Sequence, residues 1–490
     1  TLHTTYAFVF LLVMAAAIVC GTGCSKPSPG ESTKPQETAA PQLAKSTPPD
    51  IVFIIVDTLR ADHLGCYGYE RNTSPNLDAL AGRSVLCERH ITSAIPTHPA
   101  FATLGSGQYS VTHGIVAHGG RIPLRNTVPW LPALLQKAGY TTCAIDNLAP
   151  WHHGFGRGYE YYINPASRRP LSINCDSRDI NNRAIPWLEQ NREEPFFLFI
   201  HYWDPHTPYM PPRAYRRLFY EPGHDPCDPG NTSLKQLERH PLGKIWRENW
   251  LNKLVRGKTV TDAAYVEALY DGEIRYCDEA IGQVIETLDR LGLAERTLLA
   301  VTSDHGEMMY RHGIFFDHHG LYEGNVHVPL LVRHPALGPR RVRHLTAHVD
   351  LAPTLLDFCG VEAPAEMEGF SLAALMSGRR DTPLRDFIVC QECTWQMKWG
   401  LRTLDHKFIL ARQPDFYGTP PRELYDLRED PHEFHNLAGQ QPDRARRCEI
   451  LIEEWVAEKM RARGLTRDPL LTHGLTLGRA WQRRRPRKHS

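Results

Sequence analysis

The chain has 490 residues, of which 42% are hydrophobic and 23% are charged, as in a globular protein of one large or two smaller domains. With 56 basic and 55 acidic residues the formal net charge is +1, which gives no basis for a nucleic-acid partner. The 25 histidines cluster at 98–118, 201–206 and 305–327, and this uneven distribution along the chain indicates a metal or proton-transfer site.

The N-terminus has the pattern of a targeting segment, predicted over residues 1–24. Residues 6–20 form an apolar run of signal-peptide length that is short for a membrane span. The following "GTGCSK" resembles a bacterial lipoprotein signal, in which Cys24 is lipidated. A plain secretory signal and an uncleaved anchor are the alternatives. All three place the folded part outside the cytoplasm, and lipidation would anchor it in a bacterial periplasm or cell envelope.

Residues 25–49 are predicted to be a disordered, proline-rich linker. They contain almost no apolar side chains, so the segment cannot bury enough surface to fold. We interpret it as a tether between the membrane and a folded domain. The twelve cysteines are scattered and do not indicate a disulfide framework, and we interpret the lone C-x-x-C of Cys390 and Cys393 as structural.

Strands alternate with helices from residue 50 onward. Buried strands are predicted in "DIVFIIVD", "TTCAIDN", "PFFLFIHYWDPH" and "ERTLLAVTSDHGE". Helices are predicted in "LPALLQKAGY" and, from its amphipathic pattern, over 261–292. The pattern predicts an α/β fold with a mostly parallel central sheet flanked by helices. Ligands bind beyond the carboxyl ends of such strands, where Asp57, His201 to His206, and Asp304 with His305 should meet.

The chain changes character near residue 380. "DFIVCQECTWQMKWGLRTLDHKFILAR" is typical of antiparallel strands, and "CEILIEEWVAEKMRARG" of a closing helix. We predict a catalytic domain over 50–380, a smaller C-terminal α+β subdomain over 381–465 and a basic tail over 466–490.

Two carboxylates and an imidazole at strand ends indicate a metal site. Burying Asp57 and Asp304 is unfavourable unless each is paired or bound to a metal, and with His305 they suit Mn²⁺, Mg²⁺, Ca²⁺ or Zn²⁺. Taken singly, each residue could instead be a helix cap or a salt-bridge partner.

Thr97 lies between Pro96 and Pro99, where a helix can begin. A side chain at a helix N-terminus meets free backbone N–H groups and the positive end of the helix dipole, which stabilise an oxyanion. A threonine in this position is also a common N-cap, and that alternative stays open.

Several long motifs together resemble the sulfatase family of the alkaline phosphatase superfamily. They are "VDTLRADHLGCYGYERNTSPNLDALA", "PTHPAFATLGSGQYSVTHGI", "FLFIHYWDPHTPYMPP", "TSDHGEMMYRHGIFFDHHGLYEGNVHVPLLVRHP", "HVDLAPTLLDFCGV" and "ELYDLREDPHEFHNLA". They occur in the family's order from about residue 50 to 440. The resemblance implies an alkaline phosphatase-like fold with a single divalent ion, Ca²⁺, Mg²⁺ or Mn²⁺. It places the metal ligands at Asp57, Thr97, Asp304 and His305, with Thr97 as the nucleophile.

The resemblance also assigns histidines to the substrate. His206 matches the histidine that contacts the ester group and assists the leaving group. His318 lies where many members keep a substrate-binding lysine, with His319 as a competitor for that role. His113 and His118 fall in the loop after the nucleophile, and His118 matches an asparagine of related phosphodiesterases that holds a non-bridging oxygen.

The chain departs from the family's formylglycine motif, Cys or Ser in Cys-x-Pro-x-Arg. Residues 97–101 read Thr-His-Pro-Ala-Phe, so the arginine is absent, and Thr58 replaces the second residue of the family's Asp-Asp pair. Threonine cannot become formylglycine, because its extra methyl group would give a ketone. We therefore expect no formylglycine, as in members that use an unmodified hydroxyl.

These observations predict a metal-dependent hydrolase of a sulfate ester or phosphate (di)ester that works through a covalent Thr97 intermediate. Its substrate would be a sulfated or phosphorylated small molecule, glycan or lipid. The alternatives are a phospho-group transferase acting on envelope lipid or glycan, and a catalytically inactive sulfatase-like binding protein. Substrate choice is expected to depend on the long loops 151–185 and 213–260.

Overall fold

The computed structural model describes residues 48–119, 122–150, 152, 154–165, 175–240 and 242–477. The predicted signal segment, the predicted linker up to residue 47 and the end of the predicted tail lie outside the described residues. Within the described residues, no helix is both long and apolar enough to cross a bilayer.

Among the described residues the central sheet has nine strands, in the order β10-β2-β9-β7-β1-β6-β4-β5, with β8 paired to β2. They are β1 Asp50–Val56, β2 Val85–Ile91, β4 Thr141–Ile145, β5 Tyr161–Ile163, β6 Phe196–Tyr202, β7 Thr297–Thr302, β8 His327–Val328, β9 Leu330–Arg333 and β10 Arg340–Ala347. Only β8 and β9 run antiparallel to their neighbours. The predicted α/β fold with a mostly parallel sheet is therefore confirmed.

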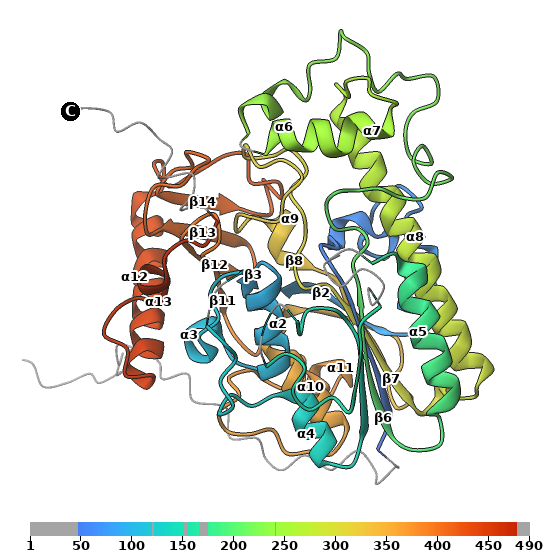
Figure 1. The fold of residues 1–490 in the computed structure, drawn as a ribbon. Helices are drawn as coiled ribbons and strands as arrows, with labels where there is room; N and C mark the ends of the chain where they lie inside the picture. The colour runs from blue at the N-terminus through green and yellow to red at the C-terminus, as the bar shows by residue number, and fades with distance from the viewer. Residues whose placement is uncertain are drawn as a thin grey trace, which may run out of the picture. The chain divides into compact units, whose positions relative to one another are not determined.

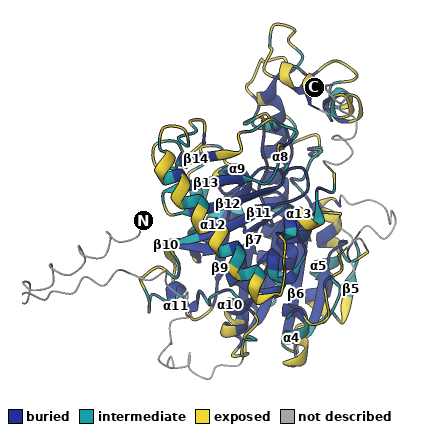
Figure 2. Cartoon of the chain, turned by 90° about the vertical axis from the view of Figure 1, so that its left-hand side faces the viewer, coloured by how far each residue is buried: buried dark blue, intermediate teal, exposed yellow. Residues whose placement is uncertain are grey.

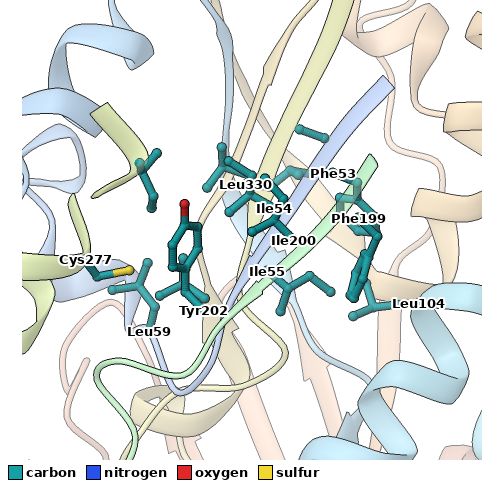
Figure 3. Packing of buried hydrophobic residues seen from close by; sticks show 14 of the residues in the cluster. Phe53, Ile54, Ile55, Leu59, Leu104, Phe199, Ile200, Tyr202, Cys277 and Leu330 are labelled. Atoms are coloured by element: carbon teal, nitrogen blue, oxygen red, sulfur yellow. The ribbon is translucent and has the colours of Figure 1, made fainter. Parts of the chain in front are cut away.

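Strand β1 lies between β6 and β7 at the centre of this sheet. Its residue Ile54 is paired with Ile200 of β6 and Val301 of β7, and every residue of the three strands is buried. Their apolar, mostly β-branched or aromatic side chains fit a sheet that is covered on both faces. Figure 3 shows this packing, in which Phe53 of β1 and Phe199 of β6 lie on one side of the sheet.

Helices cover both faces of the central sheet (Figure 1). On one side lie α5 Ser177–Gln190 and α8 Ala263–Arg290, and on the other α2 Thr97–Ser106, α4 Leu131–Lys137, α10 Leu351–Phe358 and α11 Ala373–Met376. The helix predicted over 261–292 is α8. Shorter helices are α1 Pro75–Ala81, α3 Ser110–His113, α6 Gly243–Trp246, α7 Asn252–Leu254 and α9 Glu323–Val326. Tight helical turns lie at Ala61–His63, Gly65–Tyr67, Lys235–Arg239, Ala294–Arg296 and His348–Asp350, and a wider π-helical turn at Arg247–Leu251.

A second sheet has the order β14-β13-β12-β11-β3. Its strands are β11 Phe387–Glu392, β12 Lys398–Thr403, β13 His406–Ala411, β14 Arg422–Asp426 and β3 Ala94–Ile95. The four later strands are antiparallel, as predicted, and helix α12 Pro442–Ala462 covers them with its outer face exposed (Figure 2). Strand β3 joins them in parallel, since Ala94 pairs with Gln391 and Ile95 with Glu392. The sheet therefore crosses the boundary predicted at residue 381.

Three segments predicted as irregular contain helices, and one of them, the loop predicted over 213–260, contains α6 and α7. Helix α5 begins at Ser177, inside the loop predicted over 151–185, and the side chain of Asp176 accepts a hydrogen bond from the Arg178 N–H at its start. The segment predicted as a tail from residue 466 begins with α13 Pro469–His473, whose Leu470 is buried in the second core.

Nine cysteines of the described residues, all except Cys393, are free thiols. Cys390 and Cys393 are both buried, and Cys393 Sγ lies 3.5 Å from the backbone oxygen of Leu470. These contacts are those of packing residues.

A buried carboxylate on α8 anchors the segment that follows β1. Asp271 Oδ1 accepts a hydrogen bond from His63 Nδ1 at 2.7 Å, and Oδ2 accepts from Tyr69 at 2.8 Å and Arg71 at 2.6 Å. Burial raises the pKa of Asp271, but His63 and Arg71 outweigh it and hold the pKa below its ordinary value. The carboxylate therefore stabilises the fold above the unfolded pKa, and this contribution is lost as the pH falls through the lower folded pKa.

We expect Asp271→Asn to lower the free energy of unfolding by about 3–5 kcal/mol at pH 7, because it removes one partner of a buried ion pair. Urea unfolding at several pH values measures this, and the difference from the unsubstituted protein should shrink below about pH 4. The control is Glu286→Gln at an exposed position of the same helix. Equal stability of the Asp271 variant at pH 7 would contradict this account of the contact.

Candidate active site

The predicted site residues meet at the carboxyl ends of the central strands. Asp57 directly follows β1, His201 is the penultimate residue of β6, and Asp304 and His305 come just after β7. All four side chains have an exposed fraction of 0%. Because β1 is paired with both β6 and β7, the ends of three apolar strands bring polar groups from distant parts of the chain to one edge.

Asp57, Asp304 and His305 are close enough to share one ion. One ligand atom from each lies within 4.8 Å of the others. His305 Nε2 is 3.2 Å from Asp304 Oδ2, while Asp304 Oδ1 accepts hydrogen bonds from the backbone N–H groups of Thr58 at 3.2 Å and His305 at 2.8 Å. Metal–ligand bonds of about 2.0–2.5 Å span such separations.

The unsatisfied oxygens of this cluster fit a cation. In the part of the chain that the structure describes, both oxygens of Asp57 and Oδ2 of Asp304 lack a hydrogen bond. Buried carboxylate oxygens without partners are unfavourable, and a divalent ion would satisfy them. Burial and the neighbouring Asp57 raise the pKa of Asp304. Burial also raises that of Asp57, but His206 and His201 outweigh it and hold the pKa of Asp57 below its ordinary value.

The turn after β1 is strained and held in place. Thr58 has a φ of +57°, in the left-handed region that a β-branched residue rarely adopts. Its N–H donates to Asp304, and its backbone oxygen accepts from the Tyr270 hydroxyl at 2.7 Å. Thr58 thus supports Asp304 through its backbone, while its side-chain oxygen accepts or donates no hydrogen bond among the described residues.

Thr97 is the first residue of α2 and its hydroxyl faces the cluster. Thr97 Oγ1 lies 3.2 Å from His305 Nε2, and the residue is 1% exposed. The N-cap position belongs to Pro96, which makes no side-chain capping bond. The N-cap role that the sequence left open is therefore taken by another residue, and the Thr97 hydroxyl is directed at the candidate metal ligands.

His318 lies between His305 and His206. Its ring centroid is 4.9 Å from that of each, and the ring is stacked on His305. The Nδ1 of His206 lies 2.5 Å from the backbone oxygen of Thr207, which places a proton on Nδ1 and leaves Nε2 available. Both rings are partly exposed, so the structure brings these two predicted histidines to the open side of the cluster.

His319 is held between two carboxylates. Its Nε2 is 3.2 Å from Asp317 Oδ1 and its Nδ1 is 3.1 Å from Glu392 Oε1. Although burial lowers the pKa of a histidine, Asp317 and Glu392 raise that of His319 to about 9. Both ring nitrogens are engaged, which favours His318 over His319 as the histidine that contacts substrate.

His118 also belongs to the cluster, whereas His113 does not. The His118 ring stacks on His98 at 4.0 Å, and burial together with the neighbouring His206 lowers its pKa to about 4. His113 Nε2 instead lies 3.1 Å from Thr103 Oγ1, and its Nδ1 accepts from the Ile115 N–H at 3.1 Å. Since His113 ends α3, which packs against α2, its contacts are with the helix and not with the cluster.

Comparison with known proteins identifies the family. The model of the family described as "Sulfatase" matches residues 49–361, and that described as "N-sulphoglucosamine sulphohydrolase, C-terminal" matches residues 311–456. The chain belongs to the sulfatase family. As a member it is a sulfatase-family ester hydrolase.

Individual relatives of this sulfatase-family chain are distant but cover most of its length. It is 24% identical to N-acetylglucosamine-6-O-sulfatase of Bacteroides thetaiotaomicron, over 85% of this chain and 88% of the relative. The solved structure of a protein bound to its substrate D-glucosamine-2-N,6-O-disulfate superposes on this chain with a TM-score of 0.70 at 21% identity. The match covers 85% of this chain and 99% of that protein. Phosphonate monoester hydrolase of Agrobacterium radiobacter gives a TM-score of 0.66 at 23% identity, covering 85% and 96%. Both structures share the fold.

Residues to which the sequence assigned no catalytic or binding role complete the site of this sulfatase-family chain. His201 Nε2 lies 3.3 Å from Asp57 Oδ2, and its Nδ1 lies 2.8 Å from Asp146 Oδ1 at the end of β4. Although burial lowers the pKa of His201, Asp146 and Asp57 raise it to about 10. The signal for His201 was its place at the end of an apolar strand. Glu307, which is fully buried beside His318, carried no such signal.

Proposed function

We propose that this protein is a metal-dependent hydrolase of sulfate esters or phosphate (di)esters that uses the unmodified hydroxyl of Thr97 as its nucleophile. The observation that supports this most directly is that Thr97 Oγ1 lies 3.2 Å from His305 Nε2, in a group where both oxygens of Asp57 and Oδ2 of Asp304 have no hydrogen-bond partner among the described residues. The names of the relatives, a sugar-6-O-sulfatase and a phosphonate monoester hydrolase, support this range of esters.

Asp57, Asp304 and His305, together with Thr97, are the residues proposed to hold a divalent ion. Three oxygen donors and one imidazole suit Ca²⁺, Mg²⁺ or Mn²⁺. A divalent ion bound there favours the ionised form of a neighbouring hydroxyl and offsets negative charge in the transition state.

The chain's own groups then divide the chemistry of a double displacement. The ionised Thr97 Oγ, whose proton has passed to solvent, forms a bond to sulfur or phosphorus while the bond to the leaving oxygen breaks, and the N-terminus of α2 stabilises the charge that develops. Protonated His206 donates its Nε2 proton to the leaving oxygen. Water next attacks the same sulfur or phosphorus, gives one proton to His206 and breaks the bond to Thr97 Oγ. This releases sulfate from a sulfate ester or a phosphate monoester from a diester, and it returns Thr97 and His206 to their starting states. His118 and His318 face the remaining oxygens of the substrate.

Charge favours a substrate with a single negative charge at the reacting group. One divalent ion held by the two fully buried carboxylates of Asp57 and Asp304 has its charge neutralised by them. Such an ion offsets the two charges of a phosphomonoester dianion less completely than the single charge of a sulfate ester or a phosphodiester. The proposal therefore ranks these two classes above phosphomonoesters.

The substrate class is tested with a panel of aryl sulfate, phosphodiester, phosphonate monoester and phosphomonoester on the metal-loaded full-length protein. The proposal expects turnover of the singly charged esters and a covalent adduct on the peptide that contains Thr97. Transfer to an added alcohol in preference to water would support the transferase alternative. A protein that binds a metal but turns over no ester would support the binding-protein alternative.

We further propose that the protein works outside the cytoplasm and is anchored to a membrane through its N-terminus. The apolar run over residues 6–20 and the following Cys24 support this location. Fractionation of cells that produce the full chain or Cys24→Ser tests it. Release of the variant from the membrane fraction is the expected result, and an unchanged distribution would contradict lipidation of Cys24.

We expect His206→Gln to lower kcat/KM by about 10²–10⁴-fold for alkyl esters, which leave poorly without a proton. Esters of acidic phenols need little protonation, so their turnover should change much less. A series of substrates that differ in leaving-group pKa measures this, with His224→Gln at an exposed position as the control. An equal loss of kcat/KM for all leaving groups would contradict the role of His206 as the general acid.

A further inference from the structure

A second group of potential metal ligands lies beside the site described above. It consists of Glu307 and the run Asp317, His318 and His319, and the last three can bring one ligand atom each within 4.8 Å of the others. An isolated bridge between Met308 and Asp317 holds the two segments side by side through backbone hydrogen bonds of 2.9 and 3.2 Å. The four side chains thus come from two backbone segments that lie next to each other.

The distances within this group suit a shared ion. Asp317 Oδ1 lies 3.2 Å from His319 Nε2 and 3.8 Å from His318 Nδ1, and Glu307 Oε1 also lies 3.8 Å from His318 Nδ1. Contacts of 3.8 Å are too long for hydrogen bonds. Two donors bound to one tetrahedral ion at about 2.1 Å are roughly 3.4 Å apart, which is close to the observed spacing.

Two atoms of the group lack partners. Glu307 is fully buried, and although its Oε2 accepts from the Thr207 hydroxyl at 3.1 Å, its Oε1 accepts no hydrogen bond from any described residue. His318 Nδ1 is likewise buried without a hydrogen bond among those residues. These two atoms lie 3.8 Å apart, and His318 Nδ1 is also 3.8 Å from Asp317 Oδ1, so a buried carboxylate oxygen and an imidazole nitrogen are neighbours that make no hydrogen bond.

The second sheet orients one of these ligands. Glu392, the last residue of β11, lies with its Oε1 3.1 Å from His319 Nδ1, and its Oε2 accepts from the Gly320 N–H at 2.7 Å. Histidine ligands commonly donate their other ring N–H to a carboxylate in this way. With the proton on Nδ1, the His319 Nε2 lone pair meets Asp317 Oδ1, and only a cation or a second proton relieves that contact.

We propose that Glu307, Asp317, His318 and His319 bind a second divalent transition-metal ion, such as Zn²⁺. Two imidazoles and two carboxylates favour Zn²⁺ over Ca²⁺ or Mg²⁺, which prefer oxygen ligands. The two carboxylates of Glu307 and Asp317 neutralise the charge of the ion.

The second ion would lie next to the first site, because His318 stacks on His305 at 4.9 Å. Two neighbouring ions can stabilise both the attacking and the leaving oxygen of a displacement. That catalytic role rests on the proposed function, whereas the binding of the ion does not.

Metal content of the full-length protein tests the proposal. The protein is stripped with a chelator, loaded with Zn²⁺ or Co²⁺, dialysed and measured by elemental analysis. The proposal expects two ions per chain in the unsubstituted protein and in the exposed control His224→Gln. It expects one ion per chain in His318→Gln and in Asp317→Asn. A tetrahedral Co²⁺ absorption band should appear with the second ion and be absent from both variants. Glu392→Gln should lower the affinity for the second ion by about 10–100-fold.

The two proposals fail in distinguishable ways. A single ion that is lost in Asp57→Asn and kept in His318→Gln would overturn the second site and leave the proposed function standing. A single ion that is kept in Asp57→Asn and lost in His318→Gln would support the second site and contradict the first. Since the His318 side chain is 16% exposed and makes no Nδ1 hydrogen bond, its replacement by glutamine should leave the fold intact.

Discussion

Replacing Thr97 by alanine is expected to lower kcat by about 10⁴-fold or more on every ester that the protein hydrolyses. The Thr97 hydroxyl is directed at the candidate metal ligands from the N-terminus of α2, and alanine leaves the helix unchanged while removing the attacking oxygen. Steady-state kinetics and mass spectrometry of the acid-quenched enzyme measure the loss of turnover and of the covalent adduct.

Two substitutions control for this experiment. Thr97→Ser keeps the hydroxyl and should retain both turnover and the adduct. Thr103→Ala removes another buried hydroxyl from the same helix, one whose partner is His113, so it should lower stability by about 1 kcal/mol and leave kcat unchanged. Equal turnover by Thr97→Ala would remove this residue from the mechanism.

Replacing Asp304 by asparagine is expected to abolish binding of the first ion and to lower activity by about 10³-fold or more. Asparagine keeps the oxygen that accepts from the N–H groups of Thr58 and His305, so the local fold is preserved. Burial and Asp57 raise the pKa of Asp304 in the metal-free protein, so its ionised form disfavours the fold. The metal-free variant should therefore be at least as stable as the unsubstituted protein at pH 8.

Thermal unfolding with a chelator and with added Mn²⁺ separates these effects. The unsubstituted protein should gain about 2.7 kcal/mol at an ion concentration of 100 times Kd, while Asp304→Asn gains none from this site. Because the folded pKa is raised, the metal-free protein should become more stable as the pH falls through it. Asp289→Asn on the surface is the control. An unchanged Mn²⁺ effect in Asp304→Asn would place the ion elsewhere.

The sequence was sufficient to predict the central strands and the residues that follow them. Apolar runs such as that of β1 can only be buried, and the rule for parallel sheets then places Asp57 and Asp304 at one edge. Helix α8 was recognised because its apolar face repeats along most of its 28 residues. Helix α5 was missed because most of its exposed face is polar and it contains Pro186, which usually interrupts a helix.

Contacts between distant elements could not be predicted in the same way. Nothing in the sequence pairs His201 with Asp146, since that contact depends on β4 and β6 being neighbours. The direction of a short helical turn is equally hidden, so His113 was expected near the substrate although α3 directs it toward Thr103. The unsatisfied oxygen of Glu307 became visible only once its surroundings were known.

The pairing of β3 with β11 has a consequence for any attempt to isolate a minimal enzyme. A protein cut at residue 380 would retain Asp57, Asp304 and His305, yet the short strand that leads into the nucleophile would lose the neighbour that fixes it. The carboxylate that orients His319 would disappear in the same cut. Such a fragment should keep its metal-binding strands and still be a poor catalyst, because residues after 380 position both the nucleophile and His319.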